Sequence, residues 1–266
     1  LHPRVRRQRQ MCIRDSVMIV LNIREGENTM HETIYKKLKG GLIVSCQALS
    51  EEPLYSSYIM SRMACAAKEG GAVGIRANSV EDIREIRKVV DLPIIGLVKQ
   101  EYAESEVYIT PTIKEVDALA ECGVEIIAVD CTKRVRPHGE SLLDFWNQAR
   151  KKYPGQLFMA DCSDYEEGMY AAELGFDFIG TTMSGYTSYT RERSLPDLEL
   201  MKRLSKDCPK PVMAEGGIWT PEQLKECFMT GVFAAVVGSA ITRPKEITRH
   251  FITGSGCSTN NIEEKR

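Results

Sequence analysis

The chain has 266 residues, of which 43% are hydrophobic and 27% charged, and its formal net charge is −2. This is the composition of an ordinary globular domain, and the near-neutral charge gives no reason to expect a nucleic-acid partner. Since no apolar run approaches the roughly 18 residues of a membrane-spanning helix, no membrane partner is expected either.

The cysteines and histidines give no sign of a disulfide framework or a metal site. None of the nine cysteines forms a C-x-x-C pair, and several lie inside predicted strands or helices. This pattern favours reduced thiols in a cytoplasmic protein. The four histidines are scattered without the spacing of metal ligands, so no protein-bound metal is expected.

The two ends of the chain differ in composition from the part between them. "LHPRVRRQRQMCIRDS" carries five arginines and one acidic residue, without apolar periodicity. We expect residues 1–29 to be a non-native or disordered extension, although a basic interaction arm would have the same composition. The polar, Gly/Ser-rich residues 254–266 are expected to form a flexible tail, which leaves residues 30–253 for the catalytic domain.

From Leu42 onward, short apolar runs rich in β-branched residues alternate with longer amphipathic runs. The expected strands are Leu42–Cys46, Val73–Ile75, Pro93–Val98, Ile126–Val129, Leu157–Ala160, Phe176–Ile179, Val212–Ala214 and Ala234–Val237. Each is followed by a helical pattern. In "TPEQLKECFMTG", for example, Thr220 is a predicted N-cap, Pro221 occupies the first helical position and Gly231 follows the end.

Strands that are apolar throughout, with helices between them, indicate a parallel sheet covered by helices. Eight such units in about 215 residues predict an α/β fold, a (β/α)8 TIM barrel of the phosphate-binding type. An open doubly wound sheet is the alternative. The glycine-rich dinucleotide fingerprint of that fold is missing after the first strand, where "SCQALSEEP" stands instead.

Polar residues follow the strands, at the end of a (β/α)8 barrel where active sites lie. In chain order these residues are Gln47, Arg76, Lys99, Asp130, Asp161, Thr181, Thr182, Glu215, Gly238 and Ser239. Any one of them would be explained as well by a helix cap or a rim ion pair. Together, they predict one shared pocket.

Three loops suggest what the pocket binds. Gly216-Gly217 and Gly238-Ser239 follow strands seven and eight, the common phosphate position of this fold, and Arg243 would add a charged contact. Tight turns are the alternative reason for these glycines. After strand six, "GTTMSGYTSYT" predicts a mobile loop over the site whose hydroxyl groups, including those of Ser184 and Tyr186, bind a sugar-like ligand. A solvated linker is the alternative for this segment.

The segments "KGGLIVSCQAL", "PIIGLVK", "MADCS", "GFDFIGTTMSGYT", "MAEGGIWTPEQ" and "VVGSAITRP" occur in family order between Lys37 and Thr253. On these motifs the chain resembles the N-acetylmannosamine-6-phosphate 2-epimerases of bacterial sialic acid breakdown. The resemblance implies a cytoplasmic homodimer that interconverts N-acetylmannosamine 6-phosphate and N-acetylglucosamine 6-phosphate without metal or other cofactor.

The resemblance also implies roles for single residues. Lys99 matches the catalytic lysine and Glu215 the catalytic-site glutamate, while Gln47, Arg76 and Asp161 match substrate-binding or site-organising positions. Gly216, Gly238, Ser239 and Arg243 match the phosphate end, and "CTKRVRPHG" makes Asp130 and Arg136 neighbours of the site. Gly217 stands where the family often has a basic residue, so only its backbone N–H is expected to contribute there.

Epimerisation at C2 requires removal of the proton beside the C1 aldehyde of the open-chain sugar. Lys99 can remove it only if part of its population is neutral, and Glu215 would then orient or relay, or serve as a second base on the opposite face. Two other functions fit a barrel lysine. A Schiff-base aldolase would use it as a nucleophile, and a regulatory phosphosugar-binding barrel would not turn its ligand over.

Overall fold

The structure is a computed structural model that describes residues 29–256. The chain divides into two units, Leu1–Lys37 and Leu38–Arg266. The described part of the first unit is helical, and the second contains every element named below. The extension expected over residues 1–29 and the tail expected over residues 254–266 fall almost wholly outside the described residues, although helix continues through Ser255.

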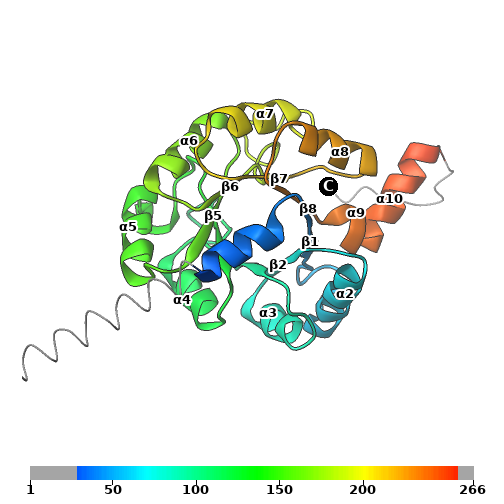
Figure 1. The fold of residues 1–266 in the computed structure, drawn as a ribbon, viewed down its shortest axis with the longest axis horizontal. Helices are drawn as coiled ribbons and strands as arrows, with labels where there is room; N and C mark the ends of the chain where they lie inside the picture. The colour runs from blue at the N-terminus through cyan, green and yellow to red at the C-terminus, as the bar shows by residue number, and fades with distance from the viewer. Residues whose placement is uncertain (1–28, 257–266) are drawn as a thin grey trace, which may run out of the picture. The chain divides into compact units, whose positions relative to one another are not determined.

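The second unit contains a closed barrel of parallel strands in the order β1 to β8, with β8 paired to β1 (Figure 1). The strands are β1 (Leu42–Cys46), β2 (Gly74–Asn78), β3 (Ile94–Leu97), β4 (Ile126–Asp130), β5 (Leu157–Asp161), β6 (Phe178–Gly180), β7 (Val212–Glu215) and β8 (Ala234–Val237). The predicted (β/α)8 barrel is therefore confirmed, and the doubly wound alternative is wrong.

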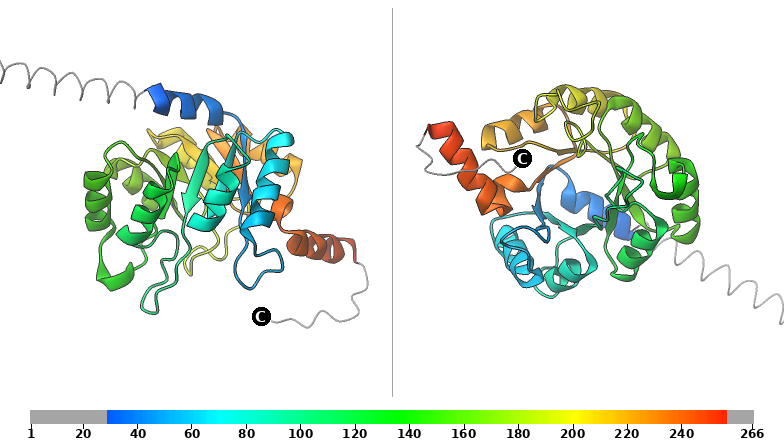
Figure 2. Two further views of the ribbon diagram at one scale, coloured as in Figure 1. Left: turned by 90° about the horizontal axis from the view of Figure 1, so that it is seen from below. Right: turned by 180° about the vertical axis from the view of Figure 1, so that it is seen from behind.

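Most of the helices surround this ring and run alongside the strands, and the last one extends away from it, as the side and rear views show (Figure 2). They are α2 (Ser57–Glu69), α3 (Val80–Arg87), α4 (Ile113–Glu121), η1 (Pro137–Gly139), α5 (Leu142–Lys152), α6 (Tyr165–Leu174), α7 (Leu198–Asp207), α8 (Pro221–Met229), α9 (Ser239–Thr242) and α10 (Pro244–Ser255). The predicted start of α8 is confirmed. The side chain of Thr220 accepts a hydrogen bond from the backbone N–H of Gln223, and Gln223 returns the contact in a capping box.

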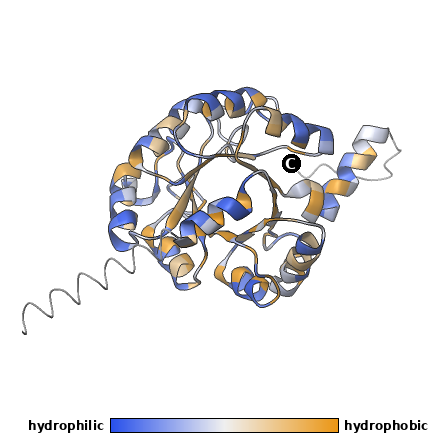
Figure 3. Cartoon of the chain, viewed as in Figure 1, coloured by the Kyte–Doolittle hydropathy of each residue, from blue (hydrophilic) through white to orange (hydrophobic). Residues whose placement is uncertain are grey.

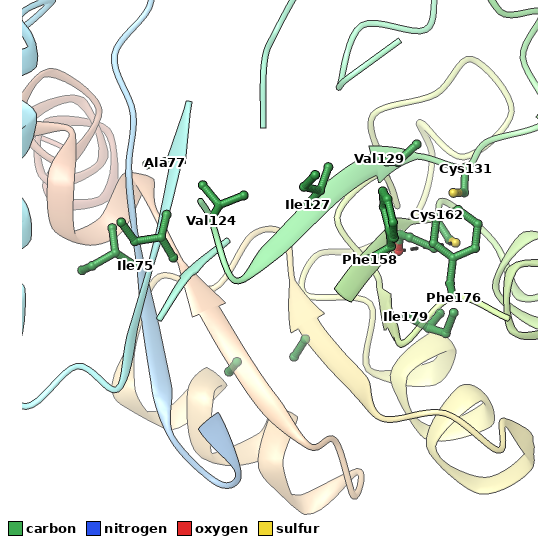
Figure 4. Close-up of a cluster of buried hydrophobic side chains, with 14 of the residues drawn as sticks. Ile75, Ala77, Val124, Ile127, Val129, Cys131, Phe158, Cys162, Phe176 and Ile179 are labelled. Atoms are coloured by element: carbon green, nitrogen blue, oxygen red, sulfur yellow. Dashed lines mark hydrogen bonds between the residues drawn. The ribbon is translucent and has the colours of Figure 1, made fainter. Parts of the chain in front are cut away.

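The main apolar core lies between the barrel and its helices. Successive strand residues point alternately outward and inward, and the outward set includes Val44, Ile75, Phe158 and Ala214 in one buried cluster. Figure 3 shows mostly apolar colouring along the strands, whereas the helices carry both polar and apolar colouring. Figure 4 shows part of this cluster, where Phe158 lies beside Phe176. The side chains that point inward consequently fill the barrel. At the carboxyl ends of the strands, these inward side chains are polar.

Two strand predictions were wrong in a way that matters for the site. The second strand was expected to end at Ile75, but β2 continues to Asn78 and buries Arg76 in its middle. Lys99 was expected to follow its strand directly, but β3 ends at Leu97. The backbone N–H of Lys99 donates to Asn78 Oδ1 at 2.8 Å. This bond fixes the start of the loop that carries the lysine.

Candidate active site

A pocket of about 230 Å³ opens at the carboxyl ends of the strands. The predicted residues that line it are Gln47, Arg76, Lys99, Thr182, Tyr186, Glu215, Gly216, Gly217, Gly238, Ser239 and Arg243. They come from β2, from the end of β7, from the loops after β1, β3, β6 and β7, and from the segment around α9 that follows β8. The barrel therefore brings residues far apart in sequence to one cavity.

Arg76 lies at the centre of the polar contacts at the pocket floor. Its guanidinium is 1% exposed and makes a two-point ion pair with Asp161, with Nη1–Oδ1 at 3.0 Å and Nη2–Oδ2 at 2.6 Å. Nη1 also donates to Glu215 Oε2 at 2.6 Å. One cation thus bridges the carboxylates that end β5 and β7. Asp161 does not line the pocket, because it lies fully buried in contact with Arg76.

Two consecutive threonines hold Glu215 from different sides. The Thr181 hydroxyl donates to the carbonyl oxygen of Glu215 at 2.8 Å and accepts from its N–H at 3.0 Å. The Thr182 hydroxyl lies 2.6 Å from Asp161 Oδ1 and 3.1 Å from Glu215 Oε2. Thr181 therefore fixes the backbone of the glutamate, while Thr182 contacts its carboxyl group.

Lys99 enters the same cavity from the loop after β3. Burial lowers the pKa of its ammonium group from the usual range to about 8, and the positive charges of Arg243 and Arg76 act in the same direction. Glu215 and Glu52 oppose this shift but do not cancel it. Roughly a tenth of the lysine is therefore neutral at pH 7, enough for it to act as a base.

Glu215 is 15% exposed at its side chain, and burial raises its pKa to about 7. Arg76 opposes this rise, Asp161 adds to it, and the Thr182 hydrogen bond and Lys99 oppose it. A carboxyl group that titrates near neutrality can both donate and accept a proton. The pocket thus contains a base and an acid of comparable pKa, coupled to each other by charge.

The glycines of the last two βα loops allow the backbone to approach the cavity. Gly216 and Gly217 adopt φ angles of 112° and 67°, which residues other than glycine rarely adopt. A Cβ on Gly217 would lie 2.4 Å from Leu195 Cβ. Arg243 borders the same end of the pocket and forms an ion pair with Glu52 at 3.1 Å. This end offers backbone donors and a guanidinium, which suit an anion.

Gln47 offers a hydrogen-bond acceptor without a protein partner. It is buried, lines the pocket, and donates from Nε2 to Ser45 Oγ at 2.8 Å. Its Oε1 is buried and has no hydrogen-bond partner among the described residues. Because buried polar atoms are normally paired, this oxygen is suited to an N–H or O–H group of a ligand.

Asp130 and Ser184, both predicted to bind substrate, lie outside the pocket lining. Asp130 accepts from Arg134 at 2.6 Å and from Thr132, so its carboxylate holds the loop after β4. Arg136 is likewise buried and donates to the backbone carbonyl of Asp130 at 2.6 Å. The sequence could not distinguish Asp130 from Asp161, because both come at the end of an apolar strand in the same pattern.

The loop after β6 uses many of its hydroxyl groups internally. Ser184 donates to Asp197 at 2.6 Å, and the hydroxyls of Thr187 and Thr190 share a hydrogen bond of 2.7 Å. All three threonine and serine side chains are buried. Within this segment, Thr182, Met183 and Tyr186 line the pocket. Most of the hydroxyl groups that were expected to bind a ligand therefore make hydrogen bonds within the protein instead.

Sequence reasoning missed Tyr108 and Trp219, which also line the pocket. Tyr108 lies in the long excursion between β3 and α4, and burial raises its pKa to about 12. Trp219 stacks on His250 of α10, with ring centroids 4.6 Å apart. The signal for Trp219 was its place two residues after Gly217, in the loop that follows β7, whereas nothing in the sequence distinguished Tyr108.

Within residues 29–256, no three His, Cys, Asp or Glu side chains are grouped so that they could hold a metal ion. The same residues include no helix with the length and apolar character that crossing a membrane requires. The charged side chains around the pocket contact one another instead, through Arg76 and Arg243.

Comparison with known proteins places this site in a family. Residues 60–256 match the family described as "Putative N-acetylmannosamine-6-phosphate epimerase". A protein of Listeria welshimeri with the name "Putative N-acetylmannosamine-6-phosphate 2-epimerase" is 52% identical over 225 residues, 84% of this chain and 95% of the relative. A Clostridium perfringens protein of the same name is 54% identical over 214 residues, 80% of this chain and 96% of the relative.

Solved structures agree. The chain is similar to a structure described as the N-acetylmannosamine-6-phosphate 2-epimerase from Clostridium perfringens, with a TM-score of 0.79 and 53% identity, covering 83% of this chain and 95% of the other. A thiamine phosphate pyrophosphorylase from Pyrococcus furiosus shares the fold alone, with a TM-score of 0.56 and 20% identity over 81% of this chain and 93% of the other. The chain therefore belongs to the N-acetylmannosamine-6-phosphate 2-epimerase family.

Proposed function

We propose that this protein epimerises C2 of N-acetylmannosamine 6-phosphate to give N-acetylglucosamine 6-phosphate, as its relatives' names state for them. The observation that carries the proposal is the pairing, in one pocket, of a partly buried lysine whose pKa is lowered with a glutamate whose pKa is raised. Proton abstraction beside a carbonyl needs both a base and an acid at neutral pH. The step belongs to amino-sugar and sialic acid degradation.

The residues that line the pocket suit a phosphosugar. We place the phosphate against the backbone N–H groups of Gly216, Gly217 and Ser239, with Arg243 beside it. Phosphate binding would then compete with Glu52 for the Arg243 guanidinium. The sugar extends toward Lys99, and Gln47 Oε1 accepts from one of its N–H or O–H groups. In this pose Asp161 acts through Arg76 and does not touch the sugar.

The chemistry starts from the open-chain sugar, in which C2 lies beside the C1 aldehyde. Neutral Lys99 removes the C2 proton, and negative charge develops on the C1 oxygen. Protonated Glu215 donates a hydrogen bond to that oxygen and stabilises the enolate. Lys99, now an ammonium, returns the proton to the other face of C2. A two-base version, with Lys99 and Glu215 on opposite faces, uses the same residues.

Proton NMR in heavy water tests the proposal. N-acetylmannosamine 6-phosphate incubated with the protein should give N-acetylglucosamine 6-phosphate carrying deuterium at C2, and Lys99→Ala should abolish the exchange. One base returning its own proton retains some hydrogen at C2 in early product, whereas two bases introduce solvent deuterium at every turnover. Unchanged sugar that nevertheless binds would refute the proposal and leave a binding protein.

The aldolase alternative has a separate test. A Schiff base on Lys99 would be trapped by borohydride as a covalent adduct, which mass spectrometry detects. We expect no adduct, because the epimerisation path never bonds the lysine nitrogen to carbon. Cleavage of the sugar into shorter fragments in the same NMR experiment would also contradict the epimerase proposal.

We also propose that the protein is a cytoplasmic homodimer. Helix α10 supports the dimer, because none of its residues is buried and Phe251 is 71% exposed. An exposed aromatic on an amphipathic helix is typical of a contact surface. Light scattering of the purified protein should give twice the mass of the chain, and Phe251→Asp should return it to the mass of one chain.

A further inference from the structure

Two loops meet at the side of the pocket near β4 and β5, across the barrel from β8. Within the described part of the chain, the loops after β4 and β5 contribute no residue to the pocket lining. The excursion between β3 and α4 and the loop after β6 form the wall there instead. The Tyr108 hydroxyl of the excursion donates to the Met183 sulfur of the β6 loop at 3.8 Å. This contact closes the pocket on that side.

The Tyr108 hydroxyl is a donor with a weak acceptor. Its hydrogen bond to the Met183 thioether is the one that the described residues give it, and a thioether sulfur accepts weakly. Asp130 and Asp161 act on the phenol by charge, but both are paired with arginines and neither lines the pocket. Burial raises the pKa of Tyr108 to about 12, so the phenol keeps its proton at neutral pH. A carbonyl oxygen of a ligand is therefore a better acceptor for this hydroxyl than the sulfur is.

The backbone holds Tyr108 close to Lys99. Lys99 lies opposite Ile109 in an antiparallel bridge, and the N–H of Gln100 donates to the carbonyl oxygen of Tyr108 at 2.9 Å. The lysine and the phenol therefore belong to one short ribbon. In the proposed reaction Lys99 acts on C2, which also carries the acetamido nitrogen. The acyl group consequently lies within a few bonds of the atom that the lysine reaches.

The side chains beside the Tyr108 hydroxyl have the chemistry that an acyl group needs. Ile109 and Met183 are apolar members of the lining there, whereas Ile218 and Val236 line the pocket from the side of the phosphate loops. A neutral donor next to apolar side chains suits an amide carbonyl that carries a small alkyl group.

We propose that Tyr108, Ile109 and Met183 form the subsite for the N-acyl group of the substrate. The phenol O–H donates to the acyl carbonyl oxygen, and the methyl group packs on the two apolar side chains. The inference deepens the proposed function, on which it rests for the placement of C2 beside Lys99.

Binding measurements test the subsite without turnover. Isothermal titration of the full chain with N-acetylglucosamine 6-phosphate measures binding to the whole site, and 2-deoxyglucose 6-phosphate, which has no substituent at C2, measures binding without the acyl group. Tyr108→Phe removes only the hydroxyl. We expect this variant to bind the acetylated sugar about tenfold more weakly and the deoxy sugar within about twofold of wild type. Inorganic phosphate, titrated in the same way, shows whether the variant is folded.

Two further variants make the test specific. Tyr102→Phe removes a hydroxyl of the same excursion that donates to Glu115 outside the pocket, and should leave both affinities within about twofold. Met183→Ala enlarges the subsite. N-butanoylglucosamine 6-phosphate has two more methylene groups than the acetyl sugar, so its affinity relative to that sugar should rise about tenfold in this variant.

The comparison of the two sugars decides the outcome. Equal weakening of both sugars by Tyr108→Phe, or no weakening, overturns the subsite. If the difference between the sugars is seen but the wild type leaves N-acetylmannosamine 6-phosphate unchanged in the NMR experiment, the proposed function fails and the subsite stands. Epimerisation by the wild type without that difference leaves the proposed function in place and refutes the subsite.

Discussion

Replacing Arg76 by methionine would leave the carboxylates of Asp161 and Glu215 at the pocket floor without the cation between them. Both lose a contact of 2.6 Å, and Asp161 loses a second of 3.0 Å. Removing one partner of a buried ion pair costs about 3–5 kcal/mol, because an uncompensated charge remains. Protonation of Glu215 relieves part of this, since burial already raises its pKa to about 7.

We expect the free energy of unfolding of Arg76→Met to fall by about 3–5 kcal/mol at pH 8 and by less at pH 5. The sign follows from the carboxyl groups. Without the arginine the pKa of Glu215 in the folded state rises further, because Arg76 no longer favours its ionised form. Ionised Glu215 then destabilises the fold above that pKa, and stability recovers as the group is protonated at lower pH. Urea unfolding followed by circular dichroism gives the free energy at each pH.

Two further variants make this test specific. Arg62→Met removes an exposed arginine of α2 and should change stability by less than about 0.5 kcal/mol. Adding Asp161→Asn to Arg76→Met removes the stranded charge and should restore at least about 2 kcal/mol at pH 8. A loss below about 1 kcal/mol in Arg76→Met, or no recovery in the double variant, would refute the reasoning.

Three other predictions concern the pH dependence, the phosphate end and a loop contact. The rate of C2 exchange should be bell-shaped with a maximum between pH values of about 7 and about 8, because Lys99 is protonated below this range and Glu215 ionised above it; a profile without an acid limb would contradict this. Arg243→Gln should raise the KM about 10–100-fold with little change in kcat, and the control sugar without phosphate should show no such effect. Gly217→Ala should destabilise the protein by about 1–3 kcal/mol, because its Cβ would meet Leu195 at 2.4 Å, whereas Gly254→Ala meets nothing within 4 Å and should not.

The order of the elements could be predicted because the outward faces of the strands and the caps of the helices depend on local sequence. Val44 and Phe158 belong to runs that are apolar on both faces, as strands of a covered parallel sheet must be. The end of β2 was missed because Arg76 and Asn78 look like loop residues. Both are buried, since the barrel interior at this level is polar. Apolar periodicity cannot identify a strand whose inward residues are charged.

The site was predictable in position but less so in detail. The carboxyl ends of the strands had to converge, and Lys99 and Glu215 do share a pocket. Which strand-end groups contact each other depends on partners elsewhere in the chain, such as Arg134 for Asp130 and Asp197 for Ser184. Such pairings come from tertiary structure, and spacing in the sequence does not specify them.

Asp130 and Asp161 are opposite one another in the register of β4 and β5, and each has its own arginine. Arg134, which pairs with Asp130, lies four residues further along the chain in the loop after β4. Arg76, which pairs with Asp161, comes from β2, across the barrel. The two buried charges are therefore neutralised independently. An enzyme engineer could rebuild the β4–α5 loop, keeping Asp130 with Arg134, and leave the electrostatics of the reacting groups as they are.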